Sequence, residues 1–257
     1  MLERLLHSCG LYLGPEVRRL QDLYIQLAKE IILNAIYQPG PHLSDGREWP
    51  PGDRFTMVGR KRLDNLEQLT RMVLEEGIAG DLIETGVWRG GATILMRAIL
   101  QAYHVTDRRV FVADSFRGIP PINPDKYPAD RAHEGMDKVE ILTNNSVERV
   151  RENFRRMNLL DEQVVFVEGW FKDSLPRLAT DRLALLRLDG DLYESTMDAF
   201  THLYPKLSPG GFIIVDDMCL EGCVKAVEDY RQAHHITDPI TTIDWTGIYW
   251  QKSNRTG

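Results

Sequence analysis

The sequence has few cysteines and no long hydrophobic run. Cys9, Cys219 and Cys223 have neither the number nor the spacing of a disulfide framework or a zinc site. No apolar stretch approaches the roughly 20 residues that a membrane-spanning helix needs. Residues 1–7 lack the apolar region and the cleavage site of a signal peptide. We therefore expect a cytoplasmic protein with reduced thiols and no membrane partner.

A basic surface is also missing. The 257 residues carry a formal net charge of −7, and lysine and arginine form no stripe along the sequence. Proteins that bind nucleic acid usually concentrate positive charge on one face, because they neutralise phosphates. The composition therefore argues against a nucleic-acid partner. The length suits one large α/β domain, or one domain with an appendage.

Two short apolar runs, each followed by two acidic residues, organise the second half of the chain. They occupy residues 185–188 and 212–215, and are typical of strands buried in a parallel sheet. Residues 193–207 between them have helical apolar spacing, and the Ser-Pro-Gly-Gly sequence at 208–211 should stop that helix. The acids that follow the two runs are Asp189, Asp191, Asp216 and Asp217. In a strand–helix–strand unit both strands end at the same edge of the sheet, where such sheets bind ligands. Because four converging carboxylates would repel one another, we expect a cation among them.

A glycine-rich turn follows an earlier apolar run. Residues 80–91 are typical of a strand, a tight turn and a helix start, with Glu84 just before Gly86. Glycine lets the backbone approach a ligand closely, and a helix N-terminus offers free N–H groups. Trp88 replaces the middle glycine of the dinucleotide-binding pattern. Glu84 therefore suits a ligand with an amine or a sulfonium; the alternative is an ordinary strand-to-helix turn.

Other residues extend this interpretation towards a nucleoside. Asp114 ends the next predicted strand, where an acid is placed to bind both hydroxyls of a ribose. Trp170 and Phe171 follow the third strand, and either stack on a purine or pack in the core. Ser146 caps a helix and would be close enough to touch a base. A ribose-containing ligand without a pyrophosphate is S-adenosylmethionine.

Secondary structure is expected over most of the chain. The predicted helices are 11–36, with apolar positions at Leu20, Leu23, Leu27, Ile31 and Ile32, then 63–76, 92–103, 146–157, 193–207 and 223–233. The segments that contain predicted strands are 80–91, 109–114, 163–171, 185–191, 210–217, 241–244 and 247–251.

Two loops would flank the predicted site. Residues 37–55 are rich in proline and glycine, and loops longer than about 12–15 residues are often functional or disordered. Since Trp49 and Phe55 are poorly suited to water, a lid over the site and a solvated connector are both open interpretations. Arg62 either belongs to a solvated helix start or clamps a ligand carboxylate. The proline-rich residues 118–131 would form a second wall of a cleft.

Five segments together resemble the macrocin O-methyltransferase family, whose members methylate sugar hydroxyls on macrolide, aminocoumarin and related natural products. They are residues 84–91, 114–116, 168–171, 187–196 and 215–217. The resemblance extends from about residue 56 to residue 250. It implies a class I methyltransferase fold, which is an α/β Rossmann-like sheet, mostly parallel, with a C-terminal antiparallel hairpin. Residues 1–78 would supply N-terminal helices and a lid, and residues 79–257 the catalytic domain.

The resemblance also implies cofactors and roles. S-adenosylmethionine and Mg²⁺ are expected, with Asp189, Asp216 and Asp217 as metal ligands and Asp191 as general base. Residues expected to line the cofactor site are Met57, Glu84, Thr85, Gly86, Gly90, Asp114, Ser115, Ser146, Gly169, Trp170, Phe171 and Asp189. The cation would orient two neighbouring hydroxyls and lower the pKa of one, and Asp191 would accept its proton. Asp198 is interpreted as a helix cap.

The same residues fit two other functions. A glycosylated small molecule is the expected acceptor, but a catechol-type enzyme would use the same metal site on vicinal phenol oxygens. A non-catalytic module that binds S-adenosylmethionine is a third hypothesis, against which the intact set of acids argues. The extra N-terminal helix leads us to expect a homo-oligomer.

Overall fold

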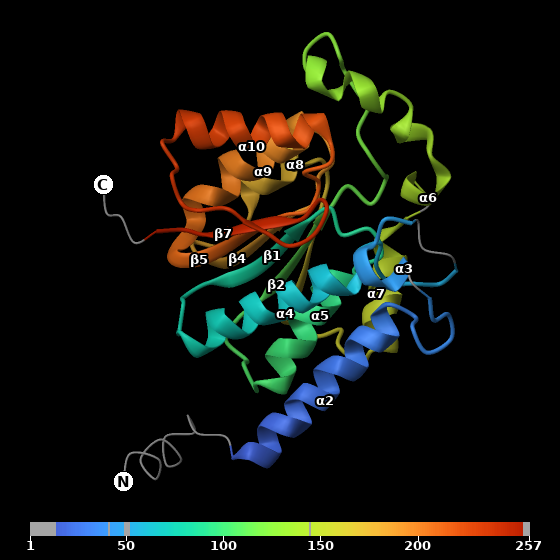
Figure 1. Ribbon diagram of the computed structural model, residues 1–257, viewed down its shortest axis with the longest axis vertical. Coiled ribbons are helices and arrows are strands. Elements are labelled where there is room, and N and C mark those ends of the chain that lie inside the picture. Colours follow the sequence, from blue (N-terminus) through green and yellow to red (C-terminus); the bar gives the residue numbers. More distant parts are fainter. Residues whose placement is uncertain (1–13, 41, 49–51, 144, 254–257) are drawn as a thin grey trace.

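A twisted seven-stranded sheet forms the centre of the computed structural model, which describes residues 14–40, 42–48, 52–143 and 145–253 (Figure 1). The strand order is β3-β2-β1-β4-β5-β7-β6. The strands are β1 (Asp81–Thr85), β2 (Val110–Asp114), β3 (Val164–Glu168), β4 (Leu183–Leu188), β5 (Leu207–Val215), β6 (Thr241–Thr242) and β7 (Ile248–Gln251). Strands β1 to β5 are parallel, and β7 runs antiparallel to both β5 and β6. The predicted sheet with its closing antiparallel pair is confirmed.

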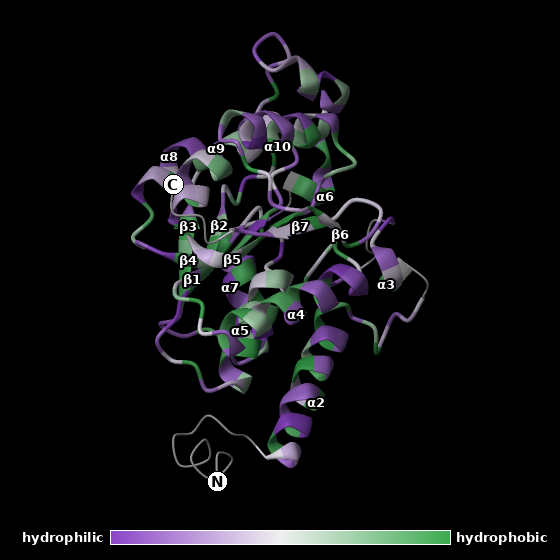
Figure 2. Cartoon of the chain, turned by 60° about the vertical axis from the view of Figure 1, so that its left-hand side comes forward, coloured by the Kyte–Doolittle hydropathy of each residue, from purple (hydrophilic) through white to green (hydrophobic). Residues whose placement is uncertain are grey.

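Helices cover both faces of the sheet. On one side lie α8 (Phe171–Ser174), α9 (Tyr193–Leu203) and α10 (Glu221–Ala233). On the other lie α2 (Pro15–Ile32), α4 (Arg60–Glu75), α5 (Gly91–Ala102) and α7 (Val147–Arg156). Short helices α3 (His42–Asp45) and α6 (Glu140–Thr143) lie in the loops at the carboxyl edge (Figure 1). Since both faces are covered, every residue of β1, β2 and β4 is buried, and Figure 2 shows these strands as largely hydrophobic.

The first described helix, α2, is shorter than predicted, and the face that it buries is not the predicted apolar face. Residues 11–13 lie outside the described part of the chain, and α2 ends at Ile32 rather than at residue 36. Of the predicted apolar positions, only Ile32 is buried; Leu20, Leu23, Leu27 and Ile31 are 38–66% exposed. Ile25 and Ala28, with the buried Lys29, turn inward instead. The helix therefore keeps an apolar face that no described residue covers.

The N-terminal helices share a core with the sheet. Side chains of α2 and α4, such as Ile25 and Leu66, belong to the same buried cluster as Ile94 of α5 and Leu185 of β4. The division at residues 78 and 79 stays a prediction.

One predicted helix stop is the start of a strand. Residues 208–211 belong to β5, which begins at Leu207, while α9 ends at Leu203 and is followed by a short 3₁₀ turn. The register explains the misassignment: Leu183 pairs with Leu207, whereas Leu185 pairs with Phe212. The additional residues form a bulge, where proline and glycine are tolerated in a strand.

None of the helices in the described ranges is long and apolar enough to cross a membrane.

Candidate active site

A cleft of about 540 Å³ lies at the carboxyl edge of the parallel strands. Its floor comes from the residues that follow β1, β4 and β5, as expected for an open α/β sheet. The proline-rich loop contributes Gly118 and Pro120 to the lining, and residues 46–48 and Trp245 also border the cleft. The predicted second wall at residues 118–131 therefore lies at the cleft.

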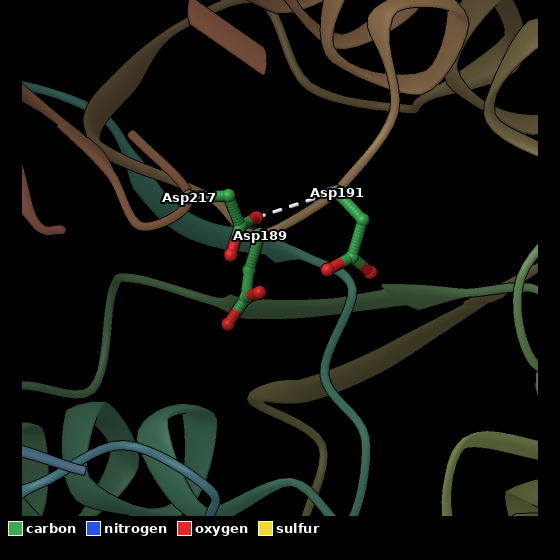
Figure 3. A group of neighbouring side chains, drawn as sticks. All are labelled: Asp189, Asp191 and Asp217. Atoms are coloured by element: carbon green, nitrogen blue, oxygen red, sulfur yellow. Dashed lines mark hydrogen bonds between the residues drawn. The ribbon is translucent and has the colours of Figure 1, made fainter. Parts of the chain in front are cut away.

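Three carboxylates from two neighbouring strand ends face one another on this floor (Figure 3). One oxygen each of Asp189, Asp191 and Asp217 lie within 4.8 Å of one another. The backbone N–H of Asp191 donates to Oδ2 of Asp217 at 3.1 Å, which joins the end of β4 to that of β5. Asp191 has a left-handed backbone, with φ of 58°. The donor set consists of carboxylate oxygens alone, the ligands that suit a hard cation such as Mg²⁺.

Asp216 lies beside this group but has different partners. Its Oδ1 accepts from Nη2 of Arg187 at 2.5 Å, and its Oδ2 is ion-paired with Nη1 of Arg62. Asp216 is only 3% exposed, whereas Asp189 keeps about a quarter of its side chain accessible. The structure thus brings together two predicted metal ligands and the predicted base, with Asp216 held by arginines at their side. Its role as a ligand stays a prediction.

The crowding of these acids changes their protonation. Burial, together with the charge of Asp216, raises the pKa of Asp189 to about 6. Burial and the charge of Asp189 raise the pKa of Asp191 to about 7. The pKa of Asp217 is also well above its ordinary value, first because of burial. The negative charge of each acid makes ionisation of its neighbours less favourable. A cation among them would therefore favour the charged forms again.

Glu84 points into the same cleft from the end of β1. Its Oε1 is ion-paired with Arg187, but its Oε2 is buried and has no hydrogen-bond partner among the described residues. Burial raises the pKa of Glu84 to about 8, although Arg187 opposes the shift. An unpartnered buried carboxylate oxygen at a glycine turn fits the amine or sulfonium of S-adenosylmethionine.

The glycine turn that follows β1 packs closely against the ends of the two adjacent strands, β4 and β2. Gly86 has φ of +84°, and a methyl group on its α-carbon would collide with the carbonyl oxygen of Asp189. The carboxylate of Asp114 accepts from the backbone N–H groups of Val87 at 2.8 Å and Phe116 at 2.7 Å. Asp114 therefore clamps the glycine turn to β2, a role that its sequence pattern does not predict. Its expected contact with ribose stays a prediction.

Most of the residues predicted for the cofactor lie along the cleft. Those that line it are Met57, Glu84, Gly86, Asp114, Ser115, Gly169, Trp170, Phe171 and Asp189. Thr85, Gly90 and Ser146 are not in its lining. Ser146 caps α7 as expected, by accepting from the backbone N–H of Arg149. Trp170 and Phe171 are half-buried at the cleft, so they are available to a ligand as well as to their neighbours.

Several residues of the site were missed in the sequence. Arg187 lies inside an apolar strand and is 1% exposed, and a lone arginine in such a run was the signal available. Trp245 lies in the β6–β7 turn, where nothing in the local pattern marks it. The interpretation of Asp198 as a helix cap is wrong, because it is the sixth residue of α9 and faces the cleft together with Glu194.

The segment predicted as a lid or a connector is folded against the cleft where it is described. Gly46, Arg47 and Glu48 belong to the lining. The indole Nε1 of Trp245 donates to the carbonyl of Asp45 at 2.9 Å. Phe55 is buried, as expected, and Trp49 lies outside the described residues.

Comparisons with known proteins all match this chain to O-methyltransferases. A family model described as macrocin-O-methyltransferase (TylF) matches residues 23–252. The chain is 49% identical over 249 residues to 8-demethyl-8-(2,3-dimethoxy-alpha-L-rhamnosyl)-tetracenomycin-C 4'-O-methyltransferase from Streptomyces olivaceus, covering 90% of this chain and 93% of that protein. It is 46% identical to mycinamicin III 3''-O-methyltransferase from Micromonospora griseorubida, covering 90% and 97% of the two chains. The solved structure of the O-methyltransferase NovP matches with a TM-score of 0.87 and 47% identity, over 91% of this chain and all of that one.

Proposed function

The chain belongs to the macrocin O-methyltransferase family and is an S-adenosylmethionine-dependent O-methyltransferase, and we propose that it methylates a sugar hydroxyl of a glycosylated natural product. The names of two relatives support the acceptor class, since one is the 4'-O-methyltransferase of a rhamnosyl-bearing tetracenomycin derivative and the other the 3''-O-methyltransferase of mycinamicin III. The observation that carries the proposal is the group formed by Asp189, Asp191 and Asp217, beside the glycine turn and inside one cleft.

In this proposal the donor lies along the glycine turn. The unpartnered oxygen of Glu84 would meet positive charge on the methionine part of S-adenosylmethionine. Gly86 leaves the backbone open for close approach, while Asp114 holds the turn against β2. Trp170 and Phe171 offer aromatic faces to the adenine. The turn is thereby already ordered in the free protein, so less conformational entropy of the backbone is lost when the ligand binds.

A divalent cation, Mg²⁺, would be held by Asp189, Asp216 and Asp217. When bound, it supplies positive charge that orients neighbouring hydroxyls of the acceptor and lowers the pKa of one of them. The carboxylates of Asp189 and Asp217 already face the cleft, and burial raises their pKa values in the absence of a cation. Asp216 would contribute from beside them, with its other contacts supplied by arginines.

Asp191 is the proposed general base. Its carboxylate faces the cleft next to Asp189, and a cation nearby would keep it in the charged form that accepts a proton. The hydrogen bond from its backbone to Asp217 fixes the position of the residue. The base would take the proton from the acceptor hydroxyl while the oxygen attacks the methyl carbon of the sulfonium; the S–CH₃ bond breaks, its electron pair stays on sulfur, and S-adenosylhomocysteine leaves.

Methyl transfer from labelled S-adenosylmethionine tests the proposal. A deoxysugar glycoside, its aglycone and catechol are offered in parallel, with EDTA and then with excess Mg²⁺. Transfer to the glycoside alone, lost in EDTA and recovered with Mg²⁺, is the expected result. Full activity in EDTA contradicts the metal site, and transfer to catechol alone indicates a phenolic acceptor. Binding of S-adenosylmethionine with no transfer to any acceptor in a sugar library would indicate a non-catalytic module.

We also propose a homo-oligomer and a cytoplasmic location. The exposed apolar side chains of α2, with Ile36 and Tyr37 just beyond it, form a surface suited to a second copy of the chain. Cys219 and Cys223 are free thiols, which is usual for cytosolic proteins. Light scattering of the wild type and of Leu23→Lys tests the oligomer: an unchanged mass in the variant would exclude this face.

A further inference from the structure

Arg62 of α4 joins three segments that are distant in the sequence. Its Nη1 is ion-paired with Oδ2 of Asp216 at the end of β5. Its Nε donates to Oδ2 of Asp244 in the β6–β7 turn at 3.1 Å, and its Nη2 to the backbone carbonyl of Asp45 at 3.2 Å. Arg62 is 6% exposed, so its charge is desolvated and depends on these partners.

Two glycines, one on each side of the Arg62 side chain, leave the space that it occupies. A methyl group on the α-carbon of Gly46 would lie 2.6 Å from Nη2, and one on Gly247 would lie 3.1 Å from Cδ. Gly46 belongs to the segment of residues 42–48 that borders the cleft, which we call the α3 segment, and Gly247 to the β6–β7 turn. The guanidinium thus sits in a slot between these two segments. An arginine suits this slot because its planar fork places three donors in fixed directions.

We propose that Arg62 is a positioning residue that couples metal binding to the closure of the α3 segment. The inference rests on the proposed function, because it needs Asp216 to be a metal ligand. Arg62 holds Oδ2 of Asp216 while Arg187 donates to Oδ1, so the two guanidiniums together fix the orientation of the carboxylate. By donating to Asp45, the Arg62 guanidinium holds the α3 segment at the rim of the cleft.

Coupling follows from the sharing of one side chain. A ligand carboxylate that is correctly oriented binds a cation more tightly, and groups that orient ligands usually change metal affinity by about 10–100-fold. If the metal stabilises Arg62 in this position, it stabilises the α3 segment as well, and the effect must be reciprocal. Without coupling, loss of the bond to Asp45 would loosen the α3 segment equally with and without the metal, so the metal dependence of its mobility is the sign of coupling.

The test uses the full-length protein and two measurements besides activity. Mn²⁺ affinity is measured by electron paramagnetic resonance, and closure by the rate of limited tryptic cleavage at Arg47, whose side chain is largely exposed. In Arg62→Met we expect Mn²⁺ affinity to fall by about 10–100-fold, faster cleavage, and loss of the protection that Mn²⁺ gives the wild type. The matched control is Arg60→Met on the same helix, where Arg60 pairs with Glu30 at the surface; it should behave as the wild type.

The outcomes separate this inference from the proposed function. Wild-type Mn²⁺ affinity or wild-type cleavage in a folded Arg62→Met variant overturns the inference alone. If the wild type binds no Mn²⁺, the proposed metal dependence fails and the coupling fails with it. Should Arg62→Met not fold, Arg62→Lys keeps the charge but cannot reach three acceptors in the same geometry. It should show both changes at smaller size, and a lysine variant equal to the wild type in both measurements also overturns the inference.

Discussion

Arg187 and Asp189 form an ion pair at the centre of the site, with Nη1 2.6 Å from Oδ2. The same guanidinium contacts Glu84 and Asp216, and it is almost completely buried. One cation of the chain therefore holds together the ends of β1, β4 and β5. It also keeps these acids from repelling one another more strongly when no metal is bound.

Replacement of Arg187 should strongly destabilise the protein. Arg187→Met leaves three acids without their common partner, and breaking a buried ion pair on one side usually costs about 3–5 kcal/mol. The free energy of unfolding in urea, with EDTA and with Mg²⁺, measures the loss. Mg²⁺ should restore part of the stability, because it replaces the missing charge. A variant as stable as the wild type in EDTA would refute this role for Arg187.

Replacement of Asp191 should remove catalysis and spare binding. In Asp191→Asn we expect kcat to fall by about 10²–10⁴-fold, the usual contribution of a general base, with little change in the affinity for S-adenosylhomocysteine. The amide has nearly the same shape, so the left-handed backbone should persist. Steady-state kinetics and calorimetry measure the two effects. A variant that retains wild-type kcat would move the role of base to another group.

The metal-free protein should lose stability as the pH rises. Asp189 and Asp191 have pKa values of about 6 and about 7 in the folded protein, mainly because of burial, and ordinary values near 3.8 when unfolded. Between these values the folded state holds protons that the unfolded state has released. The stabilisation is complete below about pH 4 and is lost by about pH 7. Thermal unfolding in EDTA across this range should show the decline, and Asp191→Asn should reduce its slope.

Two glycines separate backbone strain from steric contact. Gly86 and Gly77 both have positive φ, but an added methyl group meets the carbonyl of Asp189 at Gly86 and nothing within 4 Å at Gly77. Gly77→Ala should lower the free energy of unfolding only by the cost of a left-handed backbone in a residue with a side chain, about 1–3 kcal/mol. Gly86→Ala should cost more and also abolish binding of S-adenosylhomocysteine. Equal losses of melting temperature would show that the contact with Asp189 relaxes easily.

Trp245 should contribute to acceptor binding. It is 40% exposed at the rim of the cleft, with the guanidinium of Arg47 5.3 Å from its ring centre. Trp245→Ala should raise the acceptor KM by about tenfold or more, in line with about 1–3 kcal/mol for a lost apolar contact, and leave donor affinity unchanged. Trp245→Phe keeps a ring but loses the hydrogen bond to Asp45, so it distinguishes stacking from anchoring. An unchanged KM in Trp245→Ala would place the acceptor elsewhere.

The sheet and the convergence of acids were predictable because they depend on local patterns. Runs of buried residues predicted the strands, and the rule that parallel strands end at one edge brought Asp189 and Asp217 together. The exact partners of Asp216 were not predictable, since Arg62 is 154 positions away. The bulge in β5 was misread because Pro209 and Gly210 give the same signal at a helix stop and at an irregular strand.

The N-terminal helix shows another limit of sequence patterns. Its apolar residues predicted a helix, but Leu20 and Leu27 are exposed while Lys29 is buried against Asp64 and Glu67. Periodicity identifies an apolar face without saying whether the chain itself covers it. The ion pairs that bury Lys29 involve residues more than 30 positions away, and no local pattern marks them.

The left-handed conformation of Asp191 has an evolutionary consequence. Asparagine and glycine are the residues that most easily share this backbone geometry with aspartate, so a single codon change can remove the carboxylate and leave the loop intact. In the proposed mechanism, the product of a duplicated gene with this change would still bind the donor but would no longer transfer its methyl group. Among homologous sequences, the residue at this position should therefore distinguish active enzymes from inactive homologues better than overall sequence identity does.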